Sequence, residues 1–155
     1  MLVSIIITNR NYGEYIGQAI DSALNQTYTP IEVIVVYDGS EDDSREIIAG
    51  FGTKVRSIHK EWQGQCSCFN TGFAQCSGDL VIFLDADDML MPDAVAHHVS
   101  SHSNPAVVKS SGYLEPVNAG GFSIGGRIPG RLLPSGDYKA HFIERGPGAY
   151  RSAFT

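Results

Sequence analysis

Residues 79–88 read Asp-Leu-Val-Ile-Phe-Leu-Asp-Ala-Asp-Asp, an apolar run that ends in three carboxylates. A run of this kind is typical of a strand that is buried on both faces of a parallel sheet. Asp85, Asp87 and Asp88 would then lie at the carboxyl end of the strand, where open α/β sheets bind their ligands. The segment therefore predicts an α/β fold with an acidic ligand site.

The three carboxylates also predict a metal ion. Acids so close together repel one another unless a cation is present, and carboxylate oxygens without nearby His or Cys suit Mg²⁺ or Mn²⁺. Such an ion usually completes its coordination with substrate phosphates. No Lys or Arg lies between Asp79 and Asp93, so phosphate charge at this site would be neutralised by the ion. The alternative interpretation is a solvated acidic turn without a ligand.

Strand and helix patterns alternate through the first part of the chain. Strands are predicted at 2–8, 31–37, 54–59 and 79–85, and helices at 11–24, 40–50, 64–76 and 92–101. This order predicts a parallel sheet with right-handed crossovers. After residue 104 the pattern weakens. It favours short strands at 107–108 and 113–114, a mobile glycine-rich loop at 120–130 and a short helix at 137–144.

Three residues are predicted to mark helix ends. Asn11 has Glu14 three positions later, and Ser40 has Asp43 at the same spacing, so both pairs resemble capping boxes. We therefore expect Asn11 and Ser40 to cap the helices that follow them. Gly78 is predicted to occupy the C′ position after the third helix.

The composition favours a single domain with a real core, because the chain has 155 residues of which 43% are hydrophobic. A net charge of −6 argues against nucleic acid or an anionic membrane surface as a partner. No membrane-spanning run and no signal peptide are recognised. Cys66, Cys68 and Cys76 lack C-x-x-C spacing and are predicted to be reduced and mostly buried. We expect a cytoplasmic protein, whose contact with the inner face of a membrane would need other regions or partners.

Polar residues follow three of the predicted strands, at 8–11, 38–40 and 85–88. Because the carboxyl ends of parallel strands meet at one edge of a sheet, we expect these segments to converge. Asp38 has two interpretations that the sequence leaves open. Its carboxylate could accept a hydrogen bond from a base N–H, or it could bond its own backbone in an Asx turn.

Two common nucleotide-binding loops are absent from the sequence, because no G-x-G-x-x-G or G-x-x-x-x-G-K-[ST] follows the first strand. Glu41, Asp42 and Asp43 open the second helix and would repel a phosphate there. A phosphatase with a nucleophilic Asp is a weaker alternative. Its motif normally opens the chain and carries a hydroxyl residue just beyond, whereas Asp88 is followed by Met-Leu-Met.

Four motifs in this order resemble a known family, the inverting glycosyltransferases of family 2, which have the GT-A fold. The motifs are Ser4-Ile5-Ile6-Ile7-Thr8-Asn9-Arg10-Asn11, Asp38-Gly39-Ser40, Asn70-Thr71-Gly72 with Gly78-Asp79, and Leu84-Asp85-Ala86-Asp87-Asp88 with Pro92. The resemblance covers about residues 2–100 and, weakly, 146–154. It implies a mostly parallel, Rossmann-like sheet flanked by helices. Residues 1–103 would form a donor-binding subdomain and 104–155 an incomplete acceptor-side segment.

The resemblance also implies an activity and a set of site residues. A sugar would be transferred from a nucleoside diphosphate donor to a hydroxyl of a saccharide or lipid-linked acceptor, with Mn²⁺ or Mg²⁺ as cofactor. Among the donors, the resemblance favours a UDP-sugar. The residues implied to bind the nucleotide-sugar are Thr8, Asn9, Arg10, Asp38, Asn70, Asp85, Ala86 and Asp87. The metal ligands would be Asp87 and Asp88, and the resemblance does not assign which of the two is the direct ligand.

The sequence departs from the family pattern at several positions. Arg10 stands where an aromatic residue is frequent, Tyr37 where Asp is frequent, and Phe69 where a basic residue is usual. The family's general base lies in an acidic pair after a segment similar to 146–154. The resemblance therefore implies a chain truncated before its general base, with the catalytic residue expected beyond Thr155. The alternative is a GT-A-like module that binds a nucleotide without turnover.

Overall fold

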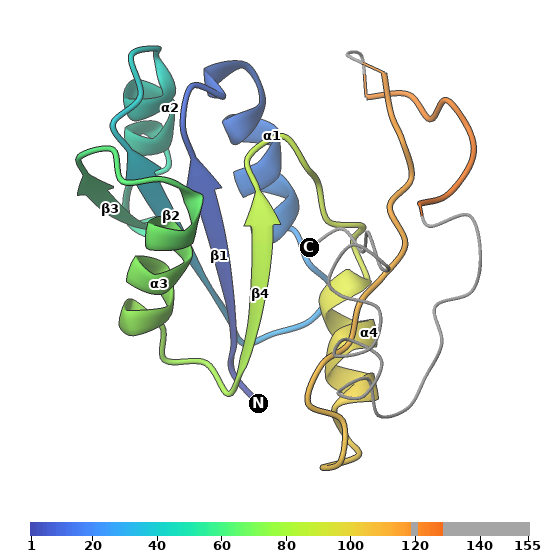
Figure 1. Ribbon diagram of the computed structural model, residues 1–155. Coiled ribbons are helices and arrows are strands. Elements are labelled where there is room, and N and C mark those ends of the chain that lie inside the picture. The colour runs from blue at the N-terminus through green and yellow to red at the C-terminus, as the bar shows by residue number, and fades with distance from the viewer. Residues whose placement is uncertain (119–120, 129–155) are drawn as a thin grey trace, which may run out of the picture. The chain divides into compact units, whose positions relative to one another are not determined.

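The computed structural model describes residues 1–118 and 121–128. Four parallel strands form one sheet in the order β3-β2-β1-β4 (Figure 1). The strands are β1 (Val3–Asn9), β2 (Ile31–Asp38), β3 (Arg56–Lys60) and β4 (Leu80–Asp85). The helices are α1 (Gly13–Leu24), α2 (Ser44–Gly50), the short 3₁₀ helix η1 (Gly52–Lys54), α3 (Gln65–Gln75) and α4 (Ala94–Ser101). The predicted α/β class and parallel sheet are confirmed.

The core consists of two layers, one on each face of the sheet. Successive side chains of a strand point to opposite faces. The layer that contains Ile5 and Ile7 also includes the apolar faces of α1, α2 and α4. The opposite layer contains Ile6 and packs against α3 through Cys68. Helices therefore cover both faces, and the carboxyl ends of the strands remain open for a ligand.

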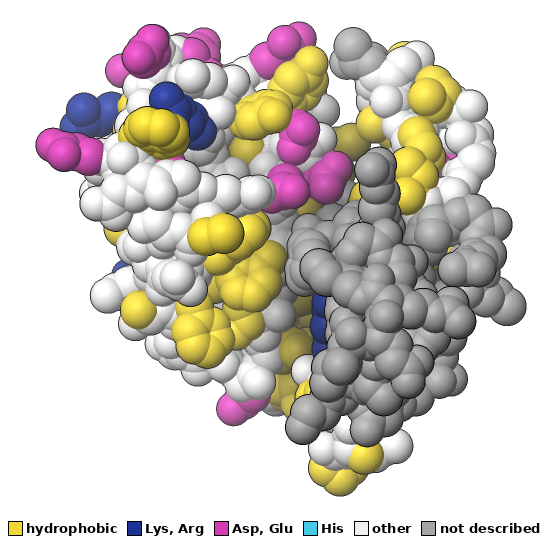
Figure 2. Space-filling model, in the orientation of Figure 1, with side chains coloured by type: hydrophobic (Ala, Val, Ile, Leu, Met, Phe, Trp, Pro, Cys, Tyr) yellow, Lys and Arg dark blue, Asp and Glu magenta, His cyan; other side chains and the backbone are white. Residues whose placement is uncertain are grey.

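The central strand is β1, whose seven residues are all buried and which pairs with β2 and β4. The prediction that the 80–84 run is buried on both faces is wrong. In the described part of the chain β4 pairs only with β1, and Val81 and Phe83 are partly exposed. Figure 2 shows hydrophobic side chains at the surface over α3 and β4. An edge position leaves β4 with fewer neighbours than β1, although both strands are apolar.

The predicted caps at Asn11 and Ser40 are wrong, because neither side chain caps a helix. Instead, the two residues hold two loops together. Ser40 Oγ accepts a hydrogen bond of 3.0 Å from the Asn11 backbone N–H, and Asn11 Oδ1 accepts one of 2.8 Å from the Glu41 N–H. The first N–H of α1, at Gly13, donates to Asp42 Oδ2 at 2.7 Å. A carboxylate 29 positions later thus satisfies a donor that a local cap would otherwise serve.

Gly78 is not the C′ residue of α3, because this helix ends at Gln75 with the extended Cys76 as its C-cap. Gly78 instead lies against β1. A Cβ at Gly78 would be 2.4 Å from Ser4 Oγ and 2.6 Å from Ser4 N. Glycine is required here because the chain approaches the β1 backbone closely before it enters β4.

Residues 1–110 form one compact unit, and the described residues 111–118 and 121–128 belong to another. The predicted short strands at 107–108 and 113–114 are not formed. Among the described residues of the second unit, only isolated bridges occur, between Leu114 and Ile128 and between Val117 and Ser123. The predicted helix at 137–144 and part of the 120–130 loop lie outside the described residues. No described helix is long and apolar enough to cross a membrane.

We expect Gly72→Ala to destabilise the fold. A Cβ at Gly72, in α3, would lie 2.4 Å from Ile6 Cγ2 in the core. Overpacking of this kind costs about 1–3 kcal/mol, which outweighs the ~0.5–1 kcal/mol that Ala gains over Gly in a helix. Gly50→Ala is the matched control, because nothing lies within 4 Å of its Cβ position. Urea denaturation should show a lower midpoint for Gly72→Ala only. Equal midpoints for the two variants would contradict this packing.

Candidate functional site

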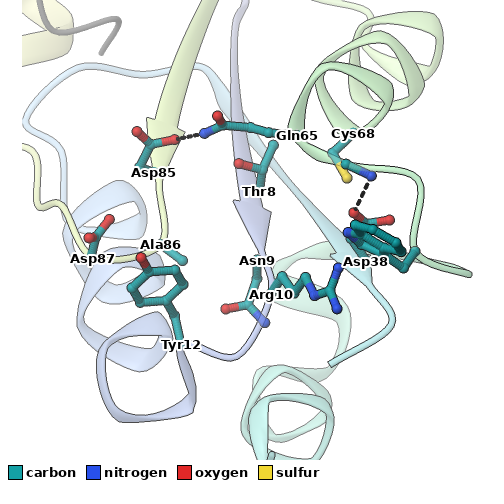
Figure 3. A pocket seen from close by; sticks show the side chains of 12 residues that line it. Thr8, Asn9, Arg10, Tyr12, Asp38, Gln65, Cys68, Asp85, Ala86 and Asp87 are labelled. Atoms are coloured by element: carbon teal, nitrogen blue, oxygen red, sulfur yellow. Dashed lines mark hydrogen bonds between the residues drawn. The ribbon is translucent and has the colours of Figure 1, made fainter. Parts of the chain in front are cut away.

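A pocket of about 370 Å³ lies at the carboxyl ends of β1, β2 and β4, and it is large enough for a nucleotide-sized ligand. Its lining residues are Thr8, Asn9, Arg10, Tyr12, Asp38, Trp62, Gly64, Gln65, Cys68, Asp85, Ala86 and Asp87. The three predicted polar segments therefore converge on one site. Figure 3 shows Asp38 and Arg10 on one side of the pocket and Asp85 and Asp87 on the other, with Thr8 and Asn9 between them.

All the predicted nucleotide-sugar residues except Asn70 line this pocket, and the predicted metal ligand Asp88 does not. Asn70 is an exposed residue of α3. Asp88 is partly buried, and its backbone N–H donates to the Asp85 carbonyl at 3.1 Å. Of the two predicted metal ligands, only Asp87 faces the pocket. The binding roles of all these residues stay predictions.

Sequence reasoning missed five of the lining residues: Tyr12, Trp62, Gly64, Gln65 and Cys68. Four of them belong to the loop after β3 and the start of α3. One signal was available, because Trp62 is the single Trp of the chain and lies in a polar run, Lys-Glu-Trp-Gln-Gly. A Trp in such a run has no local apolar partners to bury it, which indicates a surface or binding role.

Asp38 is buried, and its carboxylate holds the loop after β3. Asp38 Oδ1 accepts hydrogen bonds from Lys60 Nζ at 3.2 Å and from the Gln63 N–H at 3.0 Å. Asp38 Oδ2 accepts one from the Gly64 N–H at 2.9 Å. Burial alone would raise the pKa of Asp38, but the hydrogen bonds from Gln63, Lys60 and Gly64 outweigh it and lower this pKa. The donors lie at the end of β3 and in the loop after it, so the Asx-turn interpretation is wrong; the base contact stays a prediction.

The predicted burial of the cysteines holds only for Cys68, since Cys66 is exposed and Cys76 is partly buried. All three thiols are free. Burial, and then the negative charge of Asp38, raise the pKa of Cys68 to about 11. The Cys68 thiol therefore stays protonated at neutral pH and fills space beside Asp38.

The opposite side of the pocket is acidic. In Figure 2 acidic side chains gather near the carboxyl end of β4. Asp85 Oδ1 accepts a hydrogen bond of 2.7 Å from Gln65 Nε2. Burial, followed by the charge of Asp87, raises the pKa of Asp85, although the Gln65 bond opposes this shift. Burial, followed by the charges of Asp87 and Asp85, also raises the pKa of Asp88. The carboxylates therefore repel one another, as the sequence suggests.

The charges of the pocket fit a divalent cation. Arg10 is the one basic residue among those described as lining it, against the acids Asp38, Asp85 and Asp87. Lys60 is already paired with Asp38. A diphosphate beside Asp85 and Asp87 would add more negative charge, and carboxylate oxygens suit Mg²⁺ or Mn²⁺. In the part of the chain that the structure describes, no group of three or more His, Cys, Asp or Glu side chains could hold an ion. An ion here would therefore need phosphate or water oxygens as further ligands.

Asn9 carries an unusual polar atom. The residue is 1% exposed, and its Nδ2 donates to Ser40 Oγ at 3.3 Å. Its Oδ1 is buried and has no hydrogen-bond partner among the described residues. A buried acceptor without a partner costs about 1–3 kcal/mol, which a ligand hydroxyl or N–H could recover. The pocket therefore offers an acceptor between its two charged sides.

Comparison with known sequences identifies relatives. A model of the family described as Glycosyl transferase family 2 matches residues 4–141. An uncharacterized glycosyltransferase of Nostoc sp. is 38% identical over 122 residues, which cover 76% of this chain and 38% of the relative. Chondroitin synthase of Escherichia coli is 42% identical over 97 residues, which cover 61% of this chain and 14% of the synthase. The chain thus spans less than half the length of either relative.

Solved structures share the fold. S. aureus TarS has a TM-score of 0.59 at 26% identity, over 66% of this chain and 20% of TarS. The mannosyltransferase PcManGT from Pyrobaculum calidifontis, solved with GDP-Man and Mn²⁺, has a TM-score of 0.61 at 24% identity. That match covers 68% of this chain and 33% of PcManGT. The parallel sheet with its flanking helices is thus the GT-A fold, and because the family model matches residues 4–141, this chain belongs to glycosyl transferase family 2.

Proposed function

We propose that this chain carries the donor-binding part, residues 1–103, of an enzyme that transfers a sugar from a nucleoside diphosphate to an acceptor hydroxyl with inversion. Residues 104–155 would belong to the acceptor side. The observation that carries the proposal is the convergence of three strand ends on one pocket. The buried Asn9 Oδ1, which has no partner among the described residues, adds an acceptor for a ligand hydroxyl or N–H. Membership of the family supports the reaction class.

The two sides of the pocket suggest how a donor would lie. The base and ribose would occupy the side with Thr8, Arg10 and Asp38, with Asp85 near the ribose. The diphosphate would lie toward Asp87. The full set of proposed nucleotide-sugar residues is Thr8, Asn9, Arg10, Asp38, Asn70, Asp85, Ala86 and Asp87. Of these, Asn70 lies outside the pocket.

Asp87 is the better placed of the two proposed metal ligands, because it lines the pocket and Asp88 does not. A bound Mn²⁺ or Mg²⁺ would supply a Lewis acid that stabilises negative charge on the departing diphosphate. A hydroxyl of a saccharide or lipid-linked acceptor would attack the anomeric carbon from the opposite face. A carboxylate would take the hydroxyl proton as general base. None of the described pocket residues is assigned to that role.

Metal-dependent donor binding tests the proposal. TarS has been solved with UDP-GlcNAc and PcManGT with GDP-Man and Mn²⁺, so these donors and UDP are suitable probes. In thermal shift and calorimetry, we expect a UDP-sugar to bind in Mn²⁺ or Mg²⁺ and much more weakly in chelator. A ligand at 100 times its Kd should stabilise the fold by about 2.7 kcal/mol. Equal binding in chelator would refute the metal role, and no binding of any donor would refute the function.

A further inference from the structure

Trp62 is an exposed aromatic residue that lines the proposed donor pocket without contributing to the core. The residue is 64% exposed, and it lies in the loop between β3 and α3. The loop around it is polar, so no apolar cluster accounts for the indole at this position. Burial of a large aromatic side chain is favourable, so a ligand that covered the exposed indole would gain binding free energy.

Arg10 contacts the ring of Trp62. The guanidinium carbon lies 4.3 Å from the ring centroid, a cation–π contact between the end of β1 and the loop after β3. The guanidinium makes no salt bridge in the described part of the chain, where the ion pairs are Lys60–Asp38 and His97–Asp93. Arg10 and Trp62 therefore form a flat, π-rich pair, which we call the Arg10–Trp62 pair.

The loop that carries Trp62 is held in place on both sides of this residue. The N–H groups of Gln63 and Gly64 donate to the buried carboxylate of Asp38. Gly39 has a φ of 64°, and a Cβ there would be 3.1 Å from Trp62 N. The loop backbone thus packs directly against Gly39. The indole is positioned before any ligand arrives, so a ligand would not have to order it.

We propose that Trp62 determines donor affinity by stacking on the nucleobase, with Arg10 as the second member of the pair. This inference rests on the proposed function and extends it to a residue outside the predicted set. Every nucleobase has a π-face that can stack on an aromatic ring or a guanidinium. The phosphates would lie elsewhere, because the Asp85 and Asp87 side of the pocket is separate from the Arg10 side (Figure 3).

The experiment uses the fact that the chain has one Trp, so its fluorescence reports on this position alone. UDP in Mn²⁺ should quench the emission and protect it from acrylamide, whereas pyrophosphate in Mn²⁺ should do neither. Calorimetry should show UDP binding to Trp62→Ala weakened by roughly 5- to 150-fold, the range for loss of one base stack. Pyrophosphate binding should be unchanged, and Trp62→Phe should retain most of the UDP affinity.

Phe73→Ala is the control, because Phe73 is an exposed aromatic residue of α3 that does not line the pocket. It should bind UDP like the wild type. Unchanged UDP affinity in Trp62→Ala, or equal losses for UDP and pyrophosphate, would overturn the stacking role while leaving the proposed function intact. If the wild type bound no nucleotide at all, the proposed function would fail as well.

Discussion

Asp38→Ala should lower the free energy of unfolding by about 3–5 kcal/mol, as expected when one partner of a buried ion pair is removed. The side chains of Asp38 and Lys60 are 3% and 13% exposed, and the variant leaves the Lys60 ammonium without its carboxylate. It also frees the Gln63 and Gly64 N–H groups. Asp93→Ala is the control, because its ion pair with His97 is exposed and worth about 0–1 kcal/mol. Denaturant titration measures both losses.

Two further measurements test whether the loss of stability in Asp38→Ala comes from the buried ion pair. The double variant Asp38→Ala, Lys60→Met should recover part of the lost stability, because it removes the orphaned charge. The pKa of Asp38 is below its ordinary value of 3.8. The contribution of its carboxylate to the free energy of unfolding is therefore present above pH 3.8 and is lost as the pH falls through the folded pKa. The difference between wild type and Asp38→Ala should therefore be largest at neutral pH. A small loss that does not change with pH would contradict the buried pair.

Asp87→Ala should lower the slow metal-dependent hydrolysis of the donor by about 10²–10³-fold, because an ion that stabilises the leaving diphosphate is worth several kcal/mol. Asp87 is the predicted metal ligand that lines the pocket, and it is exposed, so its loss should leave the fold intact. The assay follows release of UDP from a UDP-sugar in Mn²⁺, with and without a panel of acceptors. Melting temperatures should match those of the wild type.

Asp93→Ala serves as the control here too, because it removes an exposed carboxylate outside the pocket. It should keep the wild-type rate and the wild-type dependence on Mn²⁺. If Asp87→Ala kept the wild-type rate and Asp88→Ala did not, the ligand assignment would pass to Asp88. If neither variant changed the rate, the metal role of this segment would be refuted.

The parallel sheet could be predicted from the sequence because its causes are local. Apolar runs that alternate with amphipathic segments specify strands and helices in turn, and this order leaves few topologies. The acidic site could be predicted for the same reason, since Asp85 ends β4 and Asp87 lies two positions beyond it. Asn9 and Asp38 also end their strands, and parallel strands bring such ends to one edge.

Other features depended on neighbours that are distant in the sequence. The apolar runs of β1 and β4 look alike, but strand order made β1 the buried centre and β4 an edge of the described sheet. Asn11 and Ser40 are residue types that often cap helices, but the side chain of each instead accepts a hydrogen bond from the backbone of the other residue's loop. A side chain takes the best hydrogen bond that the folded chain offers, which short-range spacing does not reveal.

The loop after β3 is the clearest example of a feature that depends on tertiary contacts. Asp38 binds Lys60 and the N–H groups that follow it, 22 or more positions away. These bonds bring Trp62 beside Arg10 and complete one side of the pocket. The sequence by itself determined the sheet and the carboxylates at its edge, because strands and their ends are local. Only the tertiary structure determined which groups bond to Asp38 and that Trp62 lies beside Arg10. The reason is that buried charges are stable only next to partners that folding supplies.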